Sequence, residues 1–357
     1  MKSNDPGRPL SPSRNREIDL LRFVAALTVL LYHYTYAFPA MDPSYPYHFS
    51  IGRQFRYGYL AVDLFFIISG YVIMLSAHNK TAKQFIRSRV FRLYPAYWIS
   101  CIVTFLIMVI GPSLSSKAPH VTVTQLLYNL TMFQEFFGRT SLNSVYWTLT
   151  YELSFYILII LVISFKAWDY ILYILAGWLV YTFLAGPLAI NTYLSAVLIP
   201  KYSAYFMAGI LFYLLRNKLF PAWQLYGLLG LSFIAALRSA SQLHHVFETM
   251  YADYFNFLVI AAAISSFFII FWWIAVFRPD FSSWTFFSRL GALTYPLYLL
   301  QIPGATFFYC AAGRVNNYLM LILTTFCMLL CAWLVNKFLA MRWMEWINFR
   351  RPKVAAS

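Results

Sequence analysis

Charged residues are scarce in this sequence, and acidic ones are the scarcest. Of 357 residues only 11% are charged, with 12 Asp and Glu against 27 Lys and Arg, whereas 61% are hydrophobic. Soluble domains are roughly 45–50% apolar, so this composition predicts a multi-pass membrane protein. The net charge of +15 does not indicate nucleic acid, because Lys and Arg gather on the cytoplasmic side of membrane spans. We therefore expect no nucleic-acid partner.

Cysteine is also rare. The chain contains four cysteines without a CxxC pair, namely Cys101, Cys310, Cys327 and Cys331. They lie in or beside apolar segments, so the sequence indicates neither a disulfide framework nor a cysteine metal site. We expect free thiols in the core and no bound metal.

Long apolar runs dominate what remains. Ten stretches come close to the ~20 residues that a helix needs to cross a bilayer. They cover residues 18–38, 58–77, 94–111, 144–165, 168–186, 196–215, 221–240, 254–277, 290–311 and 317–340. The predicted fold class is all-α, a polytopic integral membrane bundle of about ten transmembrane helices. Ten spans place both termini on the same side of the membrane. Lys and Arg are more frequent in the connections on that side than on the other, which predicts that both termini are cytoplasmic.

Polar segments divide the chain. Residues 1–16, rich in Pro and Ser, are predicted to form a disordered cytoplasmic tail, residues 17–345 a single membrane domain, and residues 346–357 a basic cytoplasmic tail. The longest outer connections, 39–57 and 112–143, are rich in Tyr, Phe, Ser and Thr. We expect them to cover an outward-facing acceptor site.

Two ionisable residues share the first apolar stretch. Arg22 and His33 are separated by about three helical turns, so they lie on one helix face roughly 16 Å apart along the axis. Asp19 falls on the same face. Lipid would penalise each ionisable group by ~2.5 kcal/mol or more, so this face is expected to meet a cavity or another helix. Two alternatives stay open: Arg22 snorkels to the inner interface, and His33 is a hydrogen-bonded core histidine.

Carboxylates occur in two further spans. Asp63 lies about five residues inside the outer end of its span, which is the depth expected for His33. Glu152 lies in the outer half of the fourth span. A carboxylate can orient a catalytic imidazole and stabilise its protonated form. We therefore predict that His33, Asp63 and Glu152 meet at one depth, the alternative for Asp63 being a simple pair with an arginine.

A dense basic segment precedes the third apolar stretch. It contains Lys80, Lys83, Arg87, Arg89 and Arg92. Arginine forks bind phosphate oxygens bidentately, which predicts a cytosolic ligand that bears phosphate. The alternative is that these charges only anchor the cytoplasmic end of the span.

Five motifs along nearly the whole chain resemble those of the membrane acyltransferase-3 family, which O-acylates cell-surface carbohydrates in bacteria. They are REIDLLR (16–22) followed after ten residues by His33, GYLAVDLFFIISGYVI (58–73), FIRSRVFRLYPAYW (85–98), YWTLTYELSFY (146–156) and TYPLYLLQIP (294–303). The motifs occur in the family's order, which makes the set specific although each motif alone would be loose.

The resemblance implies an O-acyltransferase of the bacterial cytoplasmic (inner) membrane. Such an enzyme would move an acyl group, expected to be acetyl, from cytosolic acetyl-CoA to a hydroxyl of an extracytoplasmic or lipid-linked carbohydrate. By matching position, His33 looks like the catalytic histidine with Arg22 as its motif partner, and Arg87, Arg89 and Arg92 match the segment that would bind CoA. Asp63 and Glu152 are similar to motif residues, and we predict that they are catalytic with His33 and that Arg22 contacts CoA. The residues expected to contact substrate are Asp19, Ser69, Trp147, Tyr151, Tyr295, Tyr298 and Gln301. Trp147 and Tyr151 also fit an interfacial aromatic belt.

Two positions depart from the family pattern. Ala61 replaces a frequent glycine, which we expect to be harmless, and Gln301 stands where many members have histidine. Glutamine cannot act as a general base, so a mechanism with a second histidine is in doubt. The competing class is a transporter or flippase that relays protons through buried Asp, Glu and His. The chain shows neither repeats nor paired interrupted helices of the transporter kind.

Overall fold

A computed structural model describes residues 15–42, 45, 47–77, 80–110, 121–188, 193–281, 283–310 and 315–349, and these residues form helices and connections. The N-terminal half contains α1 (Arg16–Tyr32), η1 (His33–Ala37), α2 (Phe38–Met41), α3 (Gly52–Phe55), η2 (Arg56–Leu60), α4 (Ala61–Ala77), α5 (Ala82–Ile110), α6 (Val123–Leu130), η4 (Gln134–Phe137), η5 (Ser144–Tyr146) and α7 (Trp147–Ser164). The C-terminal half contains η6 (Ala167–Tyr170), α8 (Ile171–Leu188), α9 (Tyr193–Leu198), α10 (Ser203–Arg216), α11 (Ala222–Tyr251), α12 (Phe257–Phe277), α13 (Thr285–Cys310) and α14 (Asn317–Phe349).

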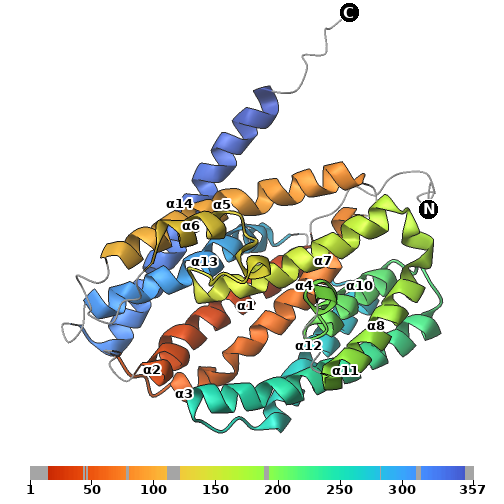
Figure 1. Cartoon of the computed structure of the whole chain (residues 1–357), viewed down its shortest axis with the longest axis horizontal. Coiled ribbons are helices and arrows are strands. Elements are labelled where there is room, and N and C mark those ends of the chain that lie inside the picture. The colour runs from red at the N-terminus through yellow and green to blue at the C-terminus, as the bar shows by residue number, and fades with distance from the viewer. Residues whose placement is uncertain are drawn as a thin grey trace, which may run out of the picture.

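The helices form a layered bundle. In Figure 1, α5, α6 and α14 lie along one side, α8, α11 and α12 along the opposite side, and α1 and α4 run between them. Helix α1 packs against both α4 and α13, and α4 packs against α10. The helix that carries Arg22 and His33 is thus packed against other helices on part of its surface, as the polar face predicts.

The described part of the chain contains seven helices that are long and apolar enough to cross a membrane. They are Arg16–Met41, Gly52–Ala77, Ala82–Ile110, Ser144–Ser164, Ala167–Ala185, Phe257–Phe277 and Asn317–Leu339, and Ser203–Arg216 is a shorter apolar helix. Helices α11 and α13 occupy the two remaining predicted spans without meeting the same length-and-composition criterion. An all-helical, multi-pass membrane architecture is therefore confirmed, whereas the count of ten and the orientation of the termini stay predictions.

The helix of the third predicted span begins earlier than the predicted range of 94–111. Helix α5 starts at Ala82, twelve residues before residue 94. The backbone N–H of Thr81 donates to Gln84 Oε1 at 3.0 Å, and the N–H of Gln84 donates to Thr81 Oγ1 at 3.3 Å. This reciprocal capping box satisfies free donors at the helix start. The basic residues from Lys83 onward therefore lie in the first turns of α5 and not in a loop before it.

Glycines bring two helix pairs into close contact. A Cβ at Gly70 of α4 would lie 2.1 Å from the carbonyl oxygen of Phe206 in α10, and one at Gly209 of α10 would lie 2.1 Å from that of Ile67. A Cβ at Gly291 of α13 would lie 2.6 Å from Cβ of Asp19 in α1. Small residues allow such backbone approach between membrane helices. The contact at Gly291 sets the place of α13 beside the N-terminal half of α1.

The structure describes only part of the two long connections that are predicted to cover the acceptor site, and only part of the two predicted tails. Tyr45, Tyr47 and Phe49 of the first outer connection are buried, and their rings pack around Phe308 of α13. Residues 112–120 of the second connection, residues 1–14 and residues 350–357 lie outside the described part of the chain. Helix α14 extends to Phe349, so the first four residues of the predicted C-terminal tail are helical. Cys101, Cys327 and Cys331 are free thiols, while the side chain of Cys310 is not described.

Candidate functional site

His33 lies where α1 changes from an α-helix to a π-helix. The π segment η1 covers His33–Ala37, and single π turns inside helices are frequent at functional sites. The His33 Nδ1 atom lies 2.9 Å from the carbonyl oxygen of Val29. A carbonyl oxygen can only accept, so Nδ1 carries the proton in this bond and Nε2 presents a lone pair. The contact thus selects the tautomer that a base or a nucleophile requires.

Gln301 provides the second contact to the same nitrogen. Its Oε1 atom lies 3.3 Å from His33 Nδ1, and its side chain is fully buried on α13. The Tyr34 hydroxyl donates to the backbone oxygen of Gln301 at 2.7 Å, which ties the π segment to α13. Gln301 can therefore hold the imidazole, although an amide cannot exchange protons as a second histidine would.

Asp63 has other partners. Its buried carboxylate interacts with the Tyr205 hydroxyl and the Lys201 ammonium. Asp63 lies on the face of α4 that includes Ile67 and Gly70, four and seven residues further on, and this face meets α10. The contacts that orient His33 thus come from Val29 and Gln301 and not, as the sequence suggested, from Asp63.

A small cavity of about 110 Å³ lies beside Arg22, three helical turns before His33. Its polar lining consists of Arg22, Ser69, Arg92, Thr148, Glu152, Thr294, Tyr295 and Tyr298. The Ser69 hydroxyl donates to Glu152 at 3.0 Å, and the Tyr156 hydroxyl donates to the same carboxylate oxygen. Arg22 lies 4.0 Å from Asp19 and faces the charges of Arg92 and Glu152. Arg22 therefore lines an internal charged cavity, in contrast to the snorkelling alternative.

The depth predicted for Glu152 is wrong. Its partner Ser69 is six residues beyond Asp63 in α4, which places Ser69 about 9 Å further along the helix axis. Glu152 shares the cavity with Arg22, which lies about three helical turns before His33. The three groups therefore do not form one catalytic layer: Glu152 belongs with the arginines.

A second, larger cavity adjoins the first. It has a volume of about 890 Å³ and extends past Asp19 to Asn15, at the start of α1. Arg22, Arg92, Gly291 and Tyr295 line both cavities. Together the cavities form a passage lined by α1, α4, α5 and α13, with the larger cavity at the N-terminal end of α1 and the smaller one near Glu152. Tyr298 and Gln301, one turn apart on α13, continue this face toward His33.

The three arginines of the basic segment lie in different environments. Arg92 lines both cavities, whereas Arg89 is buried beside Ser76, with its guanidinium 5.1 Å from the Phe85 ring. Arg87 is exposed and lies over Phe91, which is on its own helix. The neighbouring Lys80 of the same segment has a lowered pKa, mainly because it is partly buried and to a lesser extent because the Arg89 guanidinium is close. Only Arg92 of this cluster is therefore placed to meet a ligand in the passage.

Trp147 and Tyr151 lie on a different face of α7 from Glu152. Their ring centroids are 5.4 and 4.7 Å from that of Tyr202. Tyr151 also lines a separate cavity of about 650 Å³ that contains Lys201 and Arg238. Their predicted contact with substrate stays a prediction. The sequence does not single out this cavity, nor Thr148 and Thr294 of the smaller cavity, because isolated hydroxyls and single cations carry no distinctive spacing.

Comparison with known proteins defines the class. Residues 15–347 match the family model of an acyltransferase domain, so the chain belongs to this acyltransferase family. O-acetyltransferase OatA of Staphylococcus aureus is similar to it, with 26% identity over 170 residues, which is 43% of this chain and 26% of OatA; the strains NCTC 8325 and COL give the same values. The ORF330 protein of Acidianus two-tailed virus, whose name proposes an acetyltransferase activity, is 29% identical over 109 residues, or 30% of this chain and 32% of ORF330.

The chain thus matches about a quarter of the length of OatA. No solved structure matches this chain. The family resemblance predicted from the five motifs is confirmed, and the arrangement around His33 and Arg22 is the structural basis for assigning a reaction.

Proposed function

We propose that this protein is an integral membrane O-acetyltransferase that moves an acetyl group from cytosolic acetyl-CoA to a hydroxyl of an extracytoplasmic or lipid-linked carbohydrate. Membership of the acyltransferase family and the similarity to OatA support this proposal. The observation that carries it is the imidazole of His33, whose Nδ1 is held by a carbonyl oxygen so that Nε2 has a lone pair. This imidazole stands on the same helix as the cavity arginine Arg22.

The larger cavity is proposed to hold the nucleotide part of CoA. Its volume of about 890 Å³ falls within the roughly 300–1,000 Å³ of ordinary ligand pockets. Arg92 and Arg22 line it, and guanidinium groups suit phosphates. The smaller cavity suits the thin pantetheine arm better than the nucleotide. If acetyl-CoA enters from the predicted cytoplasmic side in this orientation, its thioester extends along α13 toward His33.

His33 is proposed to activate the acceptor. In direct transfer, Nε2 takes the hydroxyl proton, the sugar oxygen bonds to the thioester carbonyl carbon, and the carbon–sulfur bond breaks. The proton then passes to the leaving thiolate, which gives CoA and the acetyl ester. In the covalent alternative, Nε2 bonds to the carbonyl carbon, the carbon–sulfur bond breaks and CoA leaves as its thiolate. The hydroxyl oxygen then bonds to the acetyl carbon, the bond from that carbon to Nε2 breaks, and the hydroxyl proton neutralises the thiolate. In both routes Val29 and Gln301 accept from Nδ1–H and stabilise the positively charged ring.

Purified protein supplied with labelled acetyl-CoA tests this function. We expect label to enter the glycan, with free CoA released in equal amount, only when the glycan acceptor is present. A transporter would leave acetyl-CoA intact under these conditions. Label bound to the protein before acceptor is added would favour the covalent route. Absence of acceptor-dependent consumption with glycans isolated from the host cell would overturn the proposal.

A further inference from the structure

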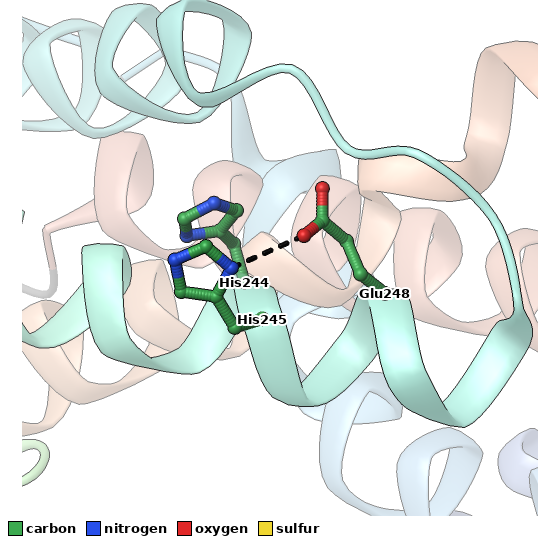
Figure 2. A group of neighbouring side chains, drawn as sticks. All are labelled: His244, His245 and Glu248. Carbon is green, nitrogen blue, oxygen red and sulfur yellow. Dashed lines mark hydrogen bonds and ion pairs between the residues drawn. The ribbon is translucent and has the colours of Figure 1, made fainter.

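The last turns of α11 carry a group of side chains that the proposed reaction does not use. His244, His245 and Glu248 each offer one potential ligand atom, and these atoms lie within 4.8 Å of one another. Figure 2 shows both imidazoles and the carboxylate gathered over the same part of the helix. The two ring centroids are 3.8 Å apart, with the ring planes tilted by 38° to each other. Adjacent residues of a helix normally point in different directions, so this convergence needs an explanation.

Backbone groups hold two of the three side chains in place. His244 Nδ1 lies 2.7 Å from the carbonyl oxygen of Ser241, so Nδ1 carries the proton and Nε2 is left with a lone pair. The backbone N–H of Phe255 donates to Glu248 Oε1 at 3.1 Å. The other oxygen, Oε2, lies 3.2 Å from His245 Nδ1, as the dashed line in Figure 2 marks. Such outer contacts orient the ligands of metal sites.

We propose that His244, His245 and Glu248 bind one divalent transition-metal ion of the zinc class. Two imidazole nitrogens and one carboxylate oxygen suit zinc and similar ions, whereas magnesium and calcium prefer oxygen ligands alone. The ion replaces the proton in the hydrogen bond between His245 Nδ1 and Glu248 Oε2. Water molecules complete its coordination. His245 is 70% exposed, so the ion enters directly from solvent.

The ion would reinforce a contact beside His33. In α11, Phe247 stacks on Tyr59 with ring centroids 4.0 Å apart, and the Tyr251 hydroxyl lies 2.6 Å from that of Tyr32, the residue before His33. Glu248 already joins this helix to Phe255 in the following connection. A metal at Glu248 therefore stabilises the turn that supports the outer end of α1. Because the ion binds the folded protein, it should raise the melting temperature.

Metal binding to the full-length, chelator-stripped protein in detergent tests this site. We expect one Zn²⁺ per chain by calorimetry, a visible absorption band with Co²⁺, and a higher melting temperature with either ion. His245→Ala should weaken binding by about tenfold or more, the scale of perturbing even the outer contacts of metal ligands. His48→Ala is the matched control, because His48 is an exposed histidine outside the group.

Equal Zn²⁺ binding by wild type and by the His245→Ala protein would overturn the proposal, as would a wild type that binds no ion. Glu248→Gln gives a second variant that keeps an oxygen for Phe255 N–H. If the Glu248→Gln protein does not fold, the Zn²⁺ affinity of the His245→Ala protein is the deciding measurement, because His245 is exposed. Binding is measured without acetyl-CoA or acceptor, so the result is independent of the proposed transfer reaction.

Discussion

The α1 polar face holds its side chains by different means at its N-terminal part, around Arg22, and at its C-terminal part, around His33. The predicted topology makes these the inner and the outer part of the face. At the inner part, Arg22 faces Asp19, Arg92 and Glu152, and these charges surround cavities. At the outer part, the described contacts of His33 Nδ1 are two neutral oxygens. Charge at the inner part can bind an anionic ligand, whereas neutral acceptors at the outer part fix a tautomer without pairing the ring with a carboxylate. In the proposed function, this difference assigns donor binding to one part of the helix and the chemical step to the other.

The largest effect is expected at the outer part. His33→Ala removes the base or nucleophile, and general base catalysis alone contributes typically ~10²–10⁴-fold in rate. We therefore expect transfer turnover to fall by this order while acetyl-CoA binding persists, because the cavity arginines lie about three turns away. Turnover and CoA affinity of the purified variant are the measurements, with His48→Ala as control. Near-normal turnover by folded His33→Ala would remove His33 from the mechanism.

The inner part is expected to respond in donor affinity. Arg92→Ala should raise the KM for acetyl-CoA by roughly tenfold, since a hydrogen bond to a charged group contributes about 1.5–3 kcal/mol. Its kcat should change much less. Arg87→Ala is the matched control on the same helix, because Arg87 does not line the two cavities. Equal increases in KM for both variants would mean that the segment acts through its overall charge, and added salt would then abolish the effect.

A smaller loss is expected at Gln301. Gln301→Met keeps an unbranched side chain of similar size but removes the oxygen beside His33 Nδ1. The Val29 carbonyl remains, so we expect kcat to fall several-fold with KM for acetyl-CoA unchanged. Tyr34→Phe serves as the control, because it removes a different hydrogen bond at the same contact between η1 and α13. If both variants lose the same activity, Gln301 supports packing and not the imidazole.

The smallest effect on turnover is expected at Asp63. Asp63→Asn keeps the shape and can still bond to Tyr205, while it loses the attraction to Lys201. We expect a lower melting temperature and only a few-fold change in kcat. Paired measurements of thermal unfolding and turnover separate the two outcomes. A loss of turnover as large as that of His33→Ala would restore Asp63 to the catalytic group.

The sequence alone was sufficient for features that depend on neighbouring residues. Apolar length predicted the membrane helices, because a span must bury about 20 residues, and seven of the predicted stretches coincide with helices that are long and apolar enough. The shared face of Arg22 and His33 follows from helical periodicity, which is local. The five motifs were specific enough to indicate the acyltransferase family.

Only the tertiary structure decided how the helices are offset and rotated against one another. Counting residues from the ends of apolar runs placed Glu152 beside His33, whereas packing places it beside Ser69 and Arg22. The same packing turns Asp63 toward α10 and brings Gln301 to His33. Each residue of axial offset moves a side chain by about 1.5 Å and rotates it by about 100°. Close contacts such as that between Gly70 and Gly209 set these offsets, and they join residues far apart in the chain.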